Sequence, residues 1–272
     1  MCGILGIIGQ DDIAGTLLEG LTSIQHRGQD AAGIVTFNHR FHLHKGDGLV
    51  SQAFKKVDLE RFRGACGLGH VRYATQGSTD VLDAQPTVVM YPFGLAMVHN
   101  GNVVNFNQLK QTLCEDAHRL LDTSNDVALI LYALAAALET KNLKTLTPHD
   151  IFDSVQAVQE KVQGAYSALT IIAGHGLLAF TDPHGIRPLV LGRKYSRADR
   201  QRRPGAQPRL PGGEAGLLHL RIHLLRPRGF GDPGPAGGDR ARAHRPAAGG
   251  AGEKGGVAAG SGDRRAVVGL FL

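Results

Sequence analysis

The sequence predicts an α+β protein in which one β-sheet packs on another. Within residues 1–194, strand-like segments come first, two helical segments lie in the middle, and strand-like segments return. This order favours stacked sheets over a doubly wound alternation of strand and helix. The composition changes abruptly at about Lys194, so we expect residues 195–272 to lie outside the folded unit.

Apolar periodicity places the individual elements. The run formed by Ile4, Leu5, Ile7 and Ile8 predicts a short buried strand. Further strands are predicted at residues 33–37, 41–45, 67–72, 87–90, 94–99, 165–173, 177–181 and 188–191.

Three helices are predicted between these strands. Apolar residues recur at helical spacing from Ile13 to Ile24, and Asp11 or Asp12 could cap that helix. A second helix is predicted at residues 127–139, after Ser124-Asn125-Asp126. The third covers residues 148–162, where Pro148 suits the first turn.

Charge is divided unevenly along the chain. Residues 1–194 hold 16 Lys and Arg against 18 Asp and Glu, a net charge of −2, whereas residues 195–272 hold 14 against 6, a net charge of +8. A nearly neutral folded part suits an enzyme for a small polar metabolite and argues against nucleic acid as its partner. No run of about 18 apolar residues occurs, so no membrane segment is predicted. The polar residues that interrupt the first apolar stretch argue against a secretory signal.

The last 78 residues are of a different kind. They contain 17 of the 37 glycines, 7 of the 12 prolines and 13 arginines against one lysine. Such a segment buries too little apolar surface to offset its conformational entropy, which predicts disorder. A second interpretation is an RNA- or membrane-binding arm, although few aromatic residues are interleaved. We favour a third, out-of-frame translation of a GC-rich gene, since such codons in the wrong register give Arg, Gly, Pro and Ala.

Cys2 is the candidate nucleophile. A free thiol is mostly protonated at neutral pH and needs a base. If Met1 is removed, the α-amine of Cys2, with an ordinary pKa of about 8, lies on the same residue and can accept the thiol proton. The alternative is an ordinary buried cysteine in the first strand.

An oxyanion hole and a substrate clamp can be assigned to other segments. Asn100 offers a side-chain NH₂ and Gly101 an unobstructed backbone N–H, the donors that attack on a carboxamide requires. The alternative for this dipeptide is an Asn-Gly hairpin turn. Arg72 ends a predicted strand and could hold a carboxylate in a bidentate pair. Asp126 could accept the substrate ammonium or simply cap its helix.

Other polar residues are assigned structural roles. Arg27 and Asp30 are expected to form an ion pair that shapes the loop over the site. His42 and His44 alternate on one strand face, but no third metal ligand is evident. The three cysteines match no disulfide, zinc or iron–sulfur pattern, which predicts a reducing compartment.

Six strings together resemble the class II glutamine amidotransferases, which are N-terminal-nucleophile hydrolases. The strings are Met1 to Ile7 (MCGILGI), Gln25 to Ile34 (QHRGQDAAGI), Gly69 to Gly77 (GHVRYATQG), His99 to Asn102 (HNGN), Thr123 to Asp126 (TSND) and Asp182 to Gly192 (DPHGIRPLVLG). Their order and spacing match through about residue 194. The strings QHRGQD and DPHGIRPLVLG are similar to those of the amidophosphoribosyltransferases within this class.

The resemblance implies a four-layer αββα sandwich, incomplete here, and a set of site residues. By position these are Cys2 as nucleophile, Asn100 and Gly101 as oxyanion hole, and Arg72, Thr75, Asp126 and Arg27 as substrate-binding residues. It further implies L-glutamine and phosphoribosyl pyrophosphate as substrates of a cytoplasmic, homo-oligomeric enzyme. That enzyme makes 5-phosphoribosylamine, glutamate and pyrophosphate, the first step of de novo purine synthesis.

The sequence departs from this family after residue 194. The expected phosphoribosyltransferase domain, with its acidic pair and Thr/Gly-rich phosphate loop, does not follow. We therefore expect Mg²⁺ only in that missing domain and no cofactor in this chain. The domains predicted are a glutaminase domain at 2–194 and a low-complexity tail at 195–272. The alternatives are a stand-alone glutaminase subunit, an inactive α/β fragment with a basic nucleic-acid-binding tail, and a fragment that does not fold.

Overall fold

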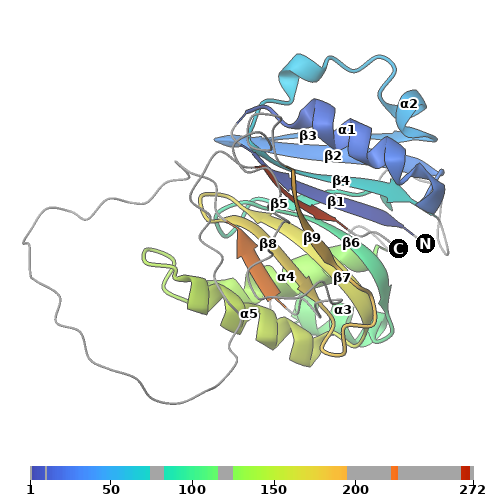
Figure 1. The fold of residues 1–272 in the computed structure, drawn as a ribbon. Helices are drawn as coiled ribbons and strands as arrows, with labels where there is room; N and C mark the ends of the chain where they lie inside the picture. The colour runs from blue at the N-terminus through green and yellow to red at the C-terminus, as the bar shows by residue number, and fades with distance from the viewer. Residues whose placement is uncertain are drawn as a thin grey trace, which may run out of the picture.

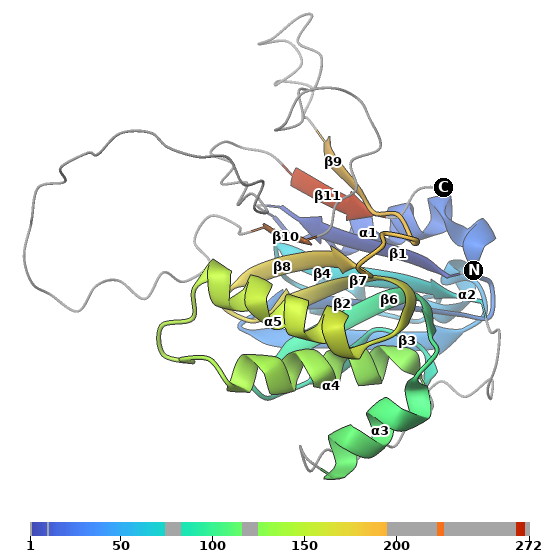
Figure 2. The same ribbon diagram turned by 90° about the horizontal axis from the view of Figure 1, so that it is seen from below.

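Two antiparallel β-sheets lie face to face, and helices cover the outer face of each (Figure 1). The computed structural model describes residues 2–9, 11–73, 83–115, 125–194, 222–225 and 265–269. The order of layers, helix, sheet, sheet, helix, is the sandwich that the sequence predicts. Figure 2 shows the same layers from below, with α4 and α5 in front of the second sheet.

The first sheet carries the N-terminal strand and has the order β3-β2-β4-β1-β11-β9. Its strands are β1 (Gly3–Ile8), β2 (Ala31–Asn38), β3 (Arg40–Asp47), β4 (Cys66–Arg72), β9 (Val190–Lys194) and β11 (Arg265–Gly269). Helices α1 (Ala14–Ser23) and α2 (Val50–Ala53) pack on its outer face, and short 3₁₀ turns cover Gln25–Arg27 and Leu59–Arg61. All six residues of β1 are buried, which explains why this strand is a continuous apolar run.

The second sheet has the order β10-β8-β7-β6-β5. Its strands are β5 (Thr87–Val89), β6 (Leu95–Val103), β7 (Gly164–Ile172), β8 (Gly176–Thr181) and β10 (Ile222–Leu225). Its outer face is covered by α3 (Phe106–Glu115), α4 (Asp126–Glu139) and α5 (Pro148–Lys161). Most of α4 is buried, in keeping with its almost wholly apolar sequence.

Apolar side chains fill three interfaces, one between each pair of neighbouring layers. The middle interface joins the two sheets and brings β1 and β4 against β6 and β7. The sheets approach closely there, since a Cβ added at Gly6 would lie 3.1 Å from the Leu177 side chain. Strands β1 and β6 are thus held in fixed positions, and they carry the two halves of the predicted site.

The helix ends show one correction. The residue at the N-cap of α1 is Ile13, with no side-chain hydrogen bond, so the prediction that Asp11 or Asp12 caps this helix is wrong. The Asp12 carboxylate accepts instead from the backbone N–H of Gly64 at 2.7 Å. Because that bond ties the start of α1 to the segment before β4, it stabilises tertiary structure more than the helix itself.

Several elements were not predicted. Helix α3 is polar and buries only Leu109 and Leu113, a weak apolar pattern. Strand β9 begins two residues later than expected. Strands β10 and β11 come from the segment interpreted as disordered or out of frame, and they pair with β8 and with β1 and β9. The rest of that segment lies outside the described residues, so both interpretations stay predictions.

Among the residues described, no helix is both long and apolar enough to span a membrane.

Candidate active site

Cys2 lies at the start of β1, beside the end of β4. The register pairs Gly3 with Val71, and its continuation by one residue places Cys2 opposite Arg72. The Cys2 thiol donates to the carbonyl oxygen of Tyr73 at 3.8 Å. Burial raises the pKa of this thiol, and the positive charges of Arg72 and Arg27 oppose that shift. Because burial is the largest effect, the thiol needs a base to become nucleophilic.

Arg27 holds the backbone of the candidate nucleophile. It is 7% exposed, and its Nε donates to the carbonyl oxygen of Cys2 at 3.1 Å. The predicted ion pair between Arg27 and Asp30 is not found in the part of the chain that the structure describes. The correction has a physical reason, since Arg27 lies in the 3₁₀ turn after α1 and is directed toward the start of β1.

Arg72 ends β4 next to a buried carboxylate. Its Nη2 lies 3.8 Å from Oδ2 of Asp83, and both side chains are about nine-tenths buried. A guanidinium carries its donors in a fixed planar fork that matches the geometry of a carboxylate. Arg72 thus lies at the end of β4, beside a buried carboxylate that the sequence did not reveal, and its role as a clamp stays a prediction.

Asn100 and Gly101 both lie inside β6, so the hairpin-turn interpretation of this dipeptide is wrong. Asn100 is 3% exposed, and its Nδ2 is buried with no hydrogen-bond partner among the described residues. An unpaired buried NH₂ costs about 1–3 kcal/mol. A buried polar group without a partner calls for an explanation, and a role in binding or catalysis is one.

Gly101 is required by the packing of β6 on β7. A Cβ at this position would lie 2.2 Å from the carbonyl oxygen of Ala165 and 2.6 Å from the Cα of Tyr166. The strand therefore tolerates no side chain here. Strand β6 contacts β1 across the interface between the sheets, so Asn100 and Gly101 lie on the strand that faces the one led by Cys2.

Asp126 opens α4 but does not cap it. The N-cap is Asn125, whose Oδ1 accepts from the backbone N–H of Val127 at 3.2 Å. Asp126 accepts from the backbone N–H of Val103 at 2.8 Å, which ties the helix to the end of β6. Burial raises the pKa of this carboxyl, and the bond from Val103 opposes the shift.

Cys2 and Arg72 lie at the ends of β1 and β4, with Arg27 bonded to Cys2. Asn100 and Gly101 lie on the facing strand β6, and Asp126 of α4 bonds to the end of that strand. Thr75 lies outside the described residues, and its predicted role stays a prediction.

Four buried polar residues around this site were missed by the sequence analysis: Asp83, Gln85, His70 and His99. Burial lowers the pKa of His70 well below its usual value and that of His99 to about 4, so both rings are neutral at neutral pH. For Asp83 and Gln85 the signal in the sequence is weak, because a polar stretch before a proline is typical of a surface loop.

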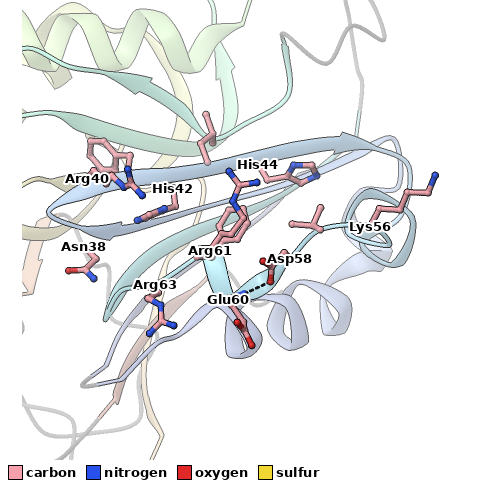
Figure 3. Close-up of a pocket in the computed structure, with 13 residues that line it drawn as sticks. Asn38, Arg40, His42, His44, Lys56, Asp58, Glu60, Arg61 and Arg63 are labelled. Carbon is pink, nitrogen blue, oxygen red and sulfur yellow. Dashed lines mark hydrogen bonds between the residues drawn. The ribbon is translucent and has the colours of Figure 1, made fainter.

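One cavity, of about 850 Å³, lies away from these residues, against β3 and residues 56–63 (Figure 3). None of the predicted site residues lines it. His42 and His44 do line it, but Nε2 of His44 is 2.9 Å from the carbonyl oxygen of Ala53. In the described part of the chain, no group of three His, Cys, Asp or Glu could hold a metal ion.

Comparison with known proteins gives consistent matches. Residues 70–199 match the family described as a glutamine amidotransferase domain. The amidophosphoribosyltransferase of Pasteurella multocida is 47% identical over 196 residues, covering 71% of this chain and 39% of that protein. The Escherichia coli enzyme of the same name is 42% identical over the same length. The solved glutamine phosphoribosylpyrophosphate amidotransferase of B. subtilis superposes with a TM-score of 0.60 at 32% identity, covering 72% of this chain and 40% of that one.

The sandwich, the cysteine at its first strand and the family match define a class. Residues 70–199 carry a glutamine amidotransferase domain, and the sandwich is similar to that of a solved amidotransferase. Within that class its relatives are the amidophosphoribosyltransferases, as the sequence strings predict. The chain spans about two fifths of the length of the curated relatives it matches, 39% for the first.

Proposed function

We propose that residues 2–194 form a glutaminase domain that hydrolyses L-glutamine to glutamate and ammonia, with Cys2 as nucleophile. The observation that carries the proposal is the buried Asn100 Nδ2, which has no partner among the described residues and lies on the strand facing β1. A buried donor that has no partner is available to stabilise the negative charge that develops on the substrate oxygen.

The first step needs a base, because burial raises the pKa of the Cys2 thiol. With Met1 removed, the free α-amine of Cys2 takes the thiol proton, directly or through a water molecule. The thiolate then attacks the side-chain carbonyl carbon of glutamine. The Asn100 side chain and the Gly101 backbone N–H donate to the carbonyl oxygen as it gains negative charge.

The second half of the reaction returns the enzyme to its starting state. The C–N bond breaks, and the ammonium of Cys2 protonates the leaving nitrogen, which departs as ammonia. Water then attacks the γ-glutamyl thioester, with the amine again as base, and releases glutamate and the free thiol. Atoms and charges balance without a cofactor.

The substrate backbone is held at two points. Arg72 pairs with the α-carboxylate of glutamine, and Asp126 accepts from its α-ammonium. Thr75 adds a polar contact, and Arg27 fixes the Cys2 backbone through the bond to its carbonyl.

In a full-length protein of this family, we infer that the ammonia is used to convert phosphoribosyl pyrophosphate into 5-phosphoribosylamine in an Mg²⁺-dependent second domain. Purine synthesis in the cytoplasm by a homo-oligomer is part of that inference. For residues 195–272 we retain the out-of-frame interpretation as a proposal. Sequencing the gene tests it, and an uninterrupted frame with related tails in sister proteins contradicts it.

The test is glutamate release from glutamine by purified chain. We expect turnover in the unaltered chain and in Cys114→Ala, and a loss of at least 10³-fold in Cys2→Ala. Equal turnover in Cys2→Ala and Cys114→Ala contradicts the proposal.

A further inference from the structure

The three residues Asp83, Ala84 and Gln85, here called the brace, lie just before β5 and are all buried, at 6%, 1% and 3% exposure. A buried carboxylate and a buried carboxamide next to each other are costly unless both are hydrogen-bonded. Their partners are therefore informative, and each of them lies at or beside the proposed site.

Gln85 is bonded at both ends of its side chain to one residue, His99. Its Oε1 accepts from the His99 backbone N–H at 2.6 Å, and its Nε2 lies 3.0 Å from the ring Nδ1. The first bond fixes which end of the carboxamide is oxygen, so Nε2 must donate to Nδ1. The low pKa of His99, about 4, makes the ring neutral, and the Gln85 donor then places the single ring proton on Nε2, so that Nδ1 accepts.

This pair continues the sheet on the N-terminal side of β5, before that strand begins. Thr87 is the first residue of β5 and pairs with Met97, and the same register continued by two residues places Gln85 opposite His99. The Gln85 side chain thus supplies the acceptor that a longer strand would have supplied to the His99 N–H. It holds β6 at the residue directly before Asn100.

The other brace residues bond to the rest of the site. Asp83 pairs with Arg72 at 3.8 Å, and its carbonyl oxygen accepts from the Asn125 side chain, which caps the helix that begins with Asp126. The carbonyl oxygen of Ala84 accepts from Lys45 Nζ at 2.6 Å.

The brace also packs directly on the first sheet. A Cβ on Gly33 of β2 would lie 2.2 Å from the carbonyl oxygen of Gln85. One short segment therefore contacts both sheets and the cap of α4.

We propose that the brace positions the two functions of the site separately: Gln85, through His99, sets the position of the oxyanion donors on β6, and Asp83 sets the position of the Arg72 clamp. Neither residue touches the reacting atoms, so both are positioning residues. The inference rests on the proposed glutaminase function. It predicts that changes at Gln85 lower kcat, whereas changes at Asp83 raise KM for glutamine.

The test compares Gln85→Met and Asp83→Asn with the unaltered chain in glutamine hydrolysis. We expect Gln85→Met to lose at least 10-fold in kcat with KM within 3-fold, and Asp83→Asn to raise KM at least 5-fold with kcat within 3-fold. The matched control is Gln159→Met, since Gln159 donates from Nε2 to the carbonyl oxygen of Thr181 at 2.7 Å, joining α5 to β8. This control is expected to lower the melting temperature with both kinetic constants unchanged.

Gln85→Glu gives a readout that loss of packing cannot give. The introduced carboxylate can still accept from the His99 backbone N–H. Its second oxygen faces the unprotonated ring Nδ1, so the hydrogen bond to the ring forms only when either group takes up a proton. The kcat of this variant relative to the unaltered chain is therefore expected to rise as pH falls from 8 to 6. The other titratable or charged groups around the brace are His70, Lys45, Arg72 and Asp83, and they are the same in both proteins.

A flat ratio across this pH range, or unchanged kcat in Gln85→Met, overturns the inference. If the unaltered chain itself releases no glutamate, the proposed function fails instead. The two failures are distinguishable because they occur in different proteins.

Discussion

The Nε of Arg27 donates to the carbonyl oxygen of Cys2 at 3.1 Å, so a buried guanidinium holds the backbone of the residue directly before β1. The same charge, with that of Arg72, acts against the burial that raises the pKa of the thiol. Position and reactivity of the nucleophile are thus set by two arginines from different elements.

Asn100→Ala is expected to lower kcat for glutamine hydrolysis by about 10²–10³-fold, the usual effect of removing one oxyanion donor. Stability should change little, because the Nδ2 that is removed has no partner among the described residues. Steady-state kinetics and a thermal melt on the same preparation check both parts.

Asn105→Ala is the matched control. Asn105 accepts from Gln163 N–H at 3.0 Å and donates to the Lys161 carbonyl at 2.9 Å. Its loss should cost about 1–3 kcal/mol of unfolding free energy and leave kcat unchanged. If the two variants lose the same amount of activity, Asn100 has no special role.

Gly101→Ala and Gly15→Ala should change stability in opposite directions. At Gly101 the new methyl group would lie 2.2 Å from a backbone oxygen of β7, so β6 and β7 must separate. We expect a loss of about 1–3 kcal/mol or more. At Gly15, within α1, nothing lies within 4 Å of the added Cβ, and a gain of about 0.5–1 kcal/mol is expected. Chemical denaturation measures both.

Arg72→Lys should raise KM for glutamine by about 10–100-fold, because a lysine cannot make the bidentate pair. Its kcat should stay within a few-fold, since the oxyanion donors are on the other sheet. Saturation kinetics test this, and an unchanged KM would remove Arg72 from the clamp.

Acid should destabilise the fold between pH 6.5 and 4. Burial lowers the pKa of His99 from 6.5 to about 4, so the unfolded chain binds a proton in this range that the folded chain does not. The stability from this residue is present above pH 6.5 and is lost as pH falls toward 4, about 3 kcal/mol in total.

Melting temperatures measured from pH 7 to 4.5 test this effect. The fall in melting temperature per pH unit should be smaller in His99→Gln than in the unaltered chain. It should be unchanged in His149→Gln, whose ring is exposed and lies beside Asp153. Equal slopes in the three proteins contradict the assignment.

The sequence predicts the layers of this fold well, because buried strands and helices leave apolar runs that can be read directly. Strands β1 to β8 and helices α1, α4 and α5 lie close to the predicted ranges. Helix α3 is missed because only two of its residues face the core. The cap of α1 is mispredicted because the Asp12 carboxylate bonds to Gly64, which is distant in sequence.

The site is predicted in part. Residue types and motif strings suggest Cys2, Arg72, Asn100, Gly101 and Asp126, but their neighbours depend on strand register and on contacts between the sheets. The pairing of Gln85 with His99 is of this kind, since it follows from where β5 begins. The partner of Arg27 is also set by such contacts. Arg27 was predicted to pair with Asp30, but it donates to the carbonyl oxygen of Cys2.

We propose that the thiol and the free amine of Cys2 act together on a carboxamide. It is tested most directly by incubating the purified chain with a diazo-ketone analogue of glutamine and locating the label by mass spectrometry. We predict one label per chain, on Cys2, in molecules that lack Met1 and not in molecules that retain it. Label on Cys66 or Cys114 instead, or equal labelling of Cys2 whether or not Met1 is present, contradicts the claim.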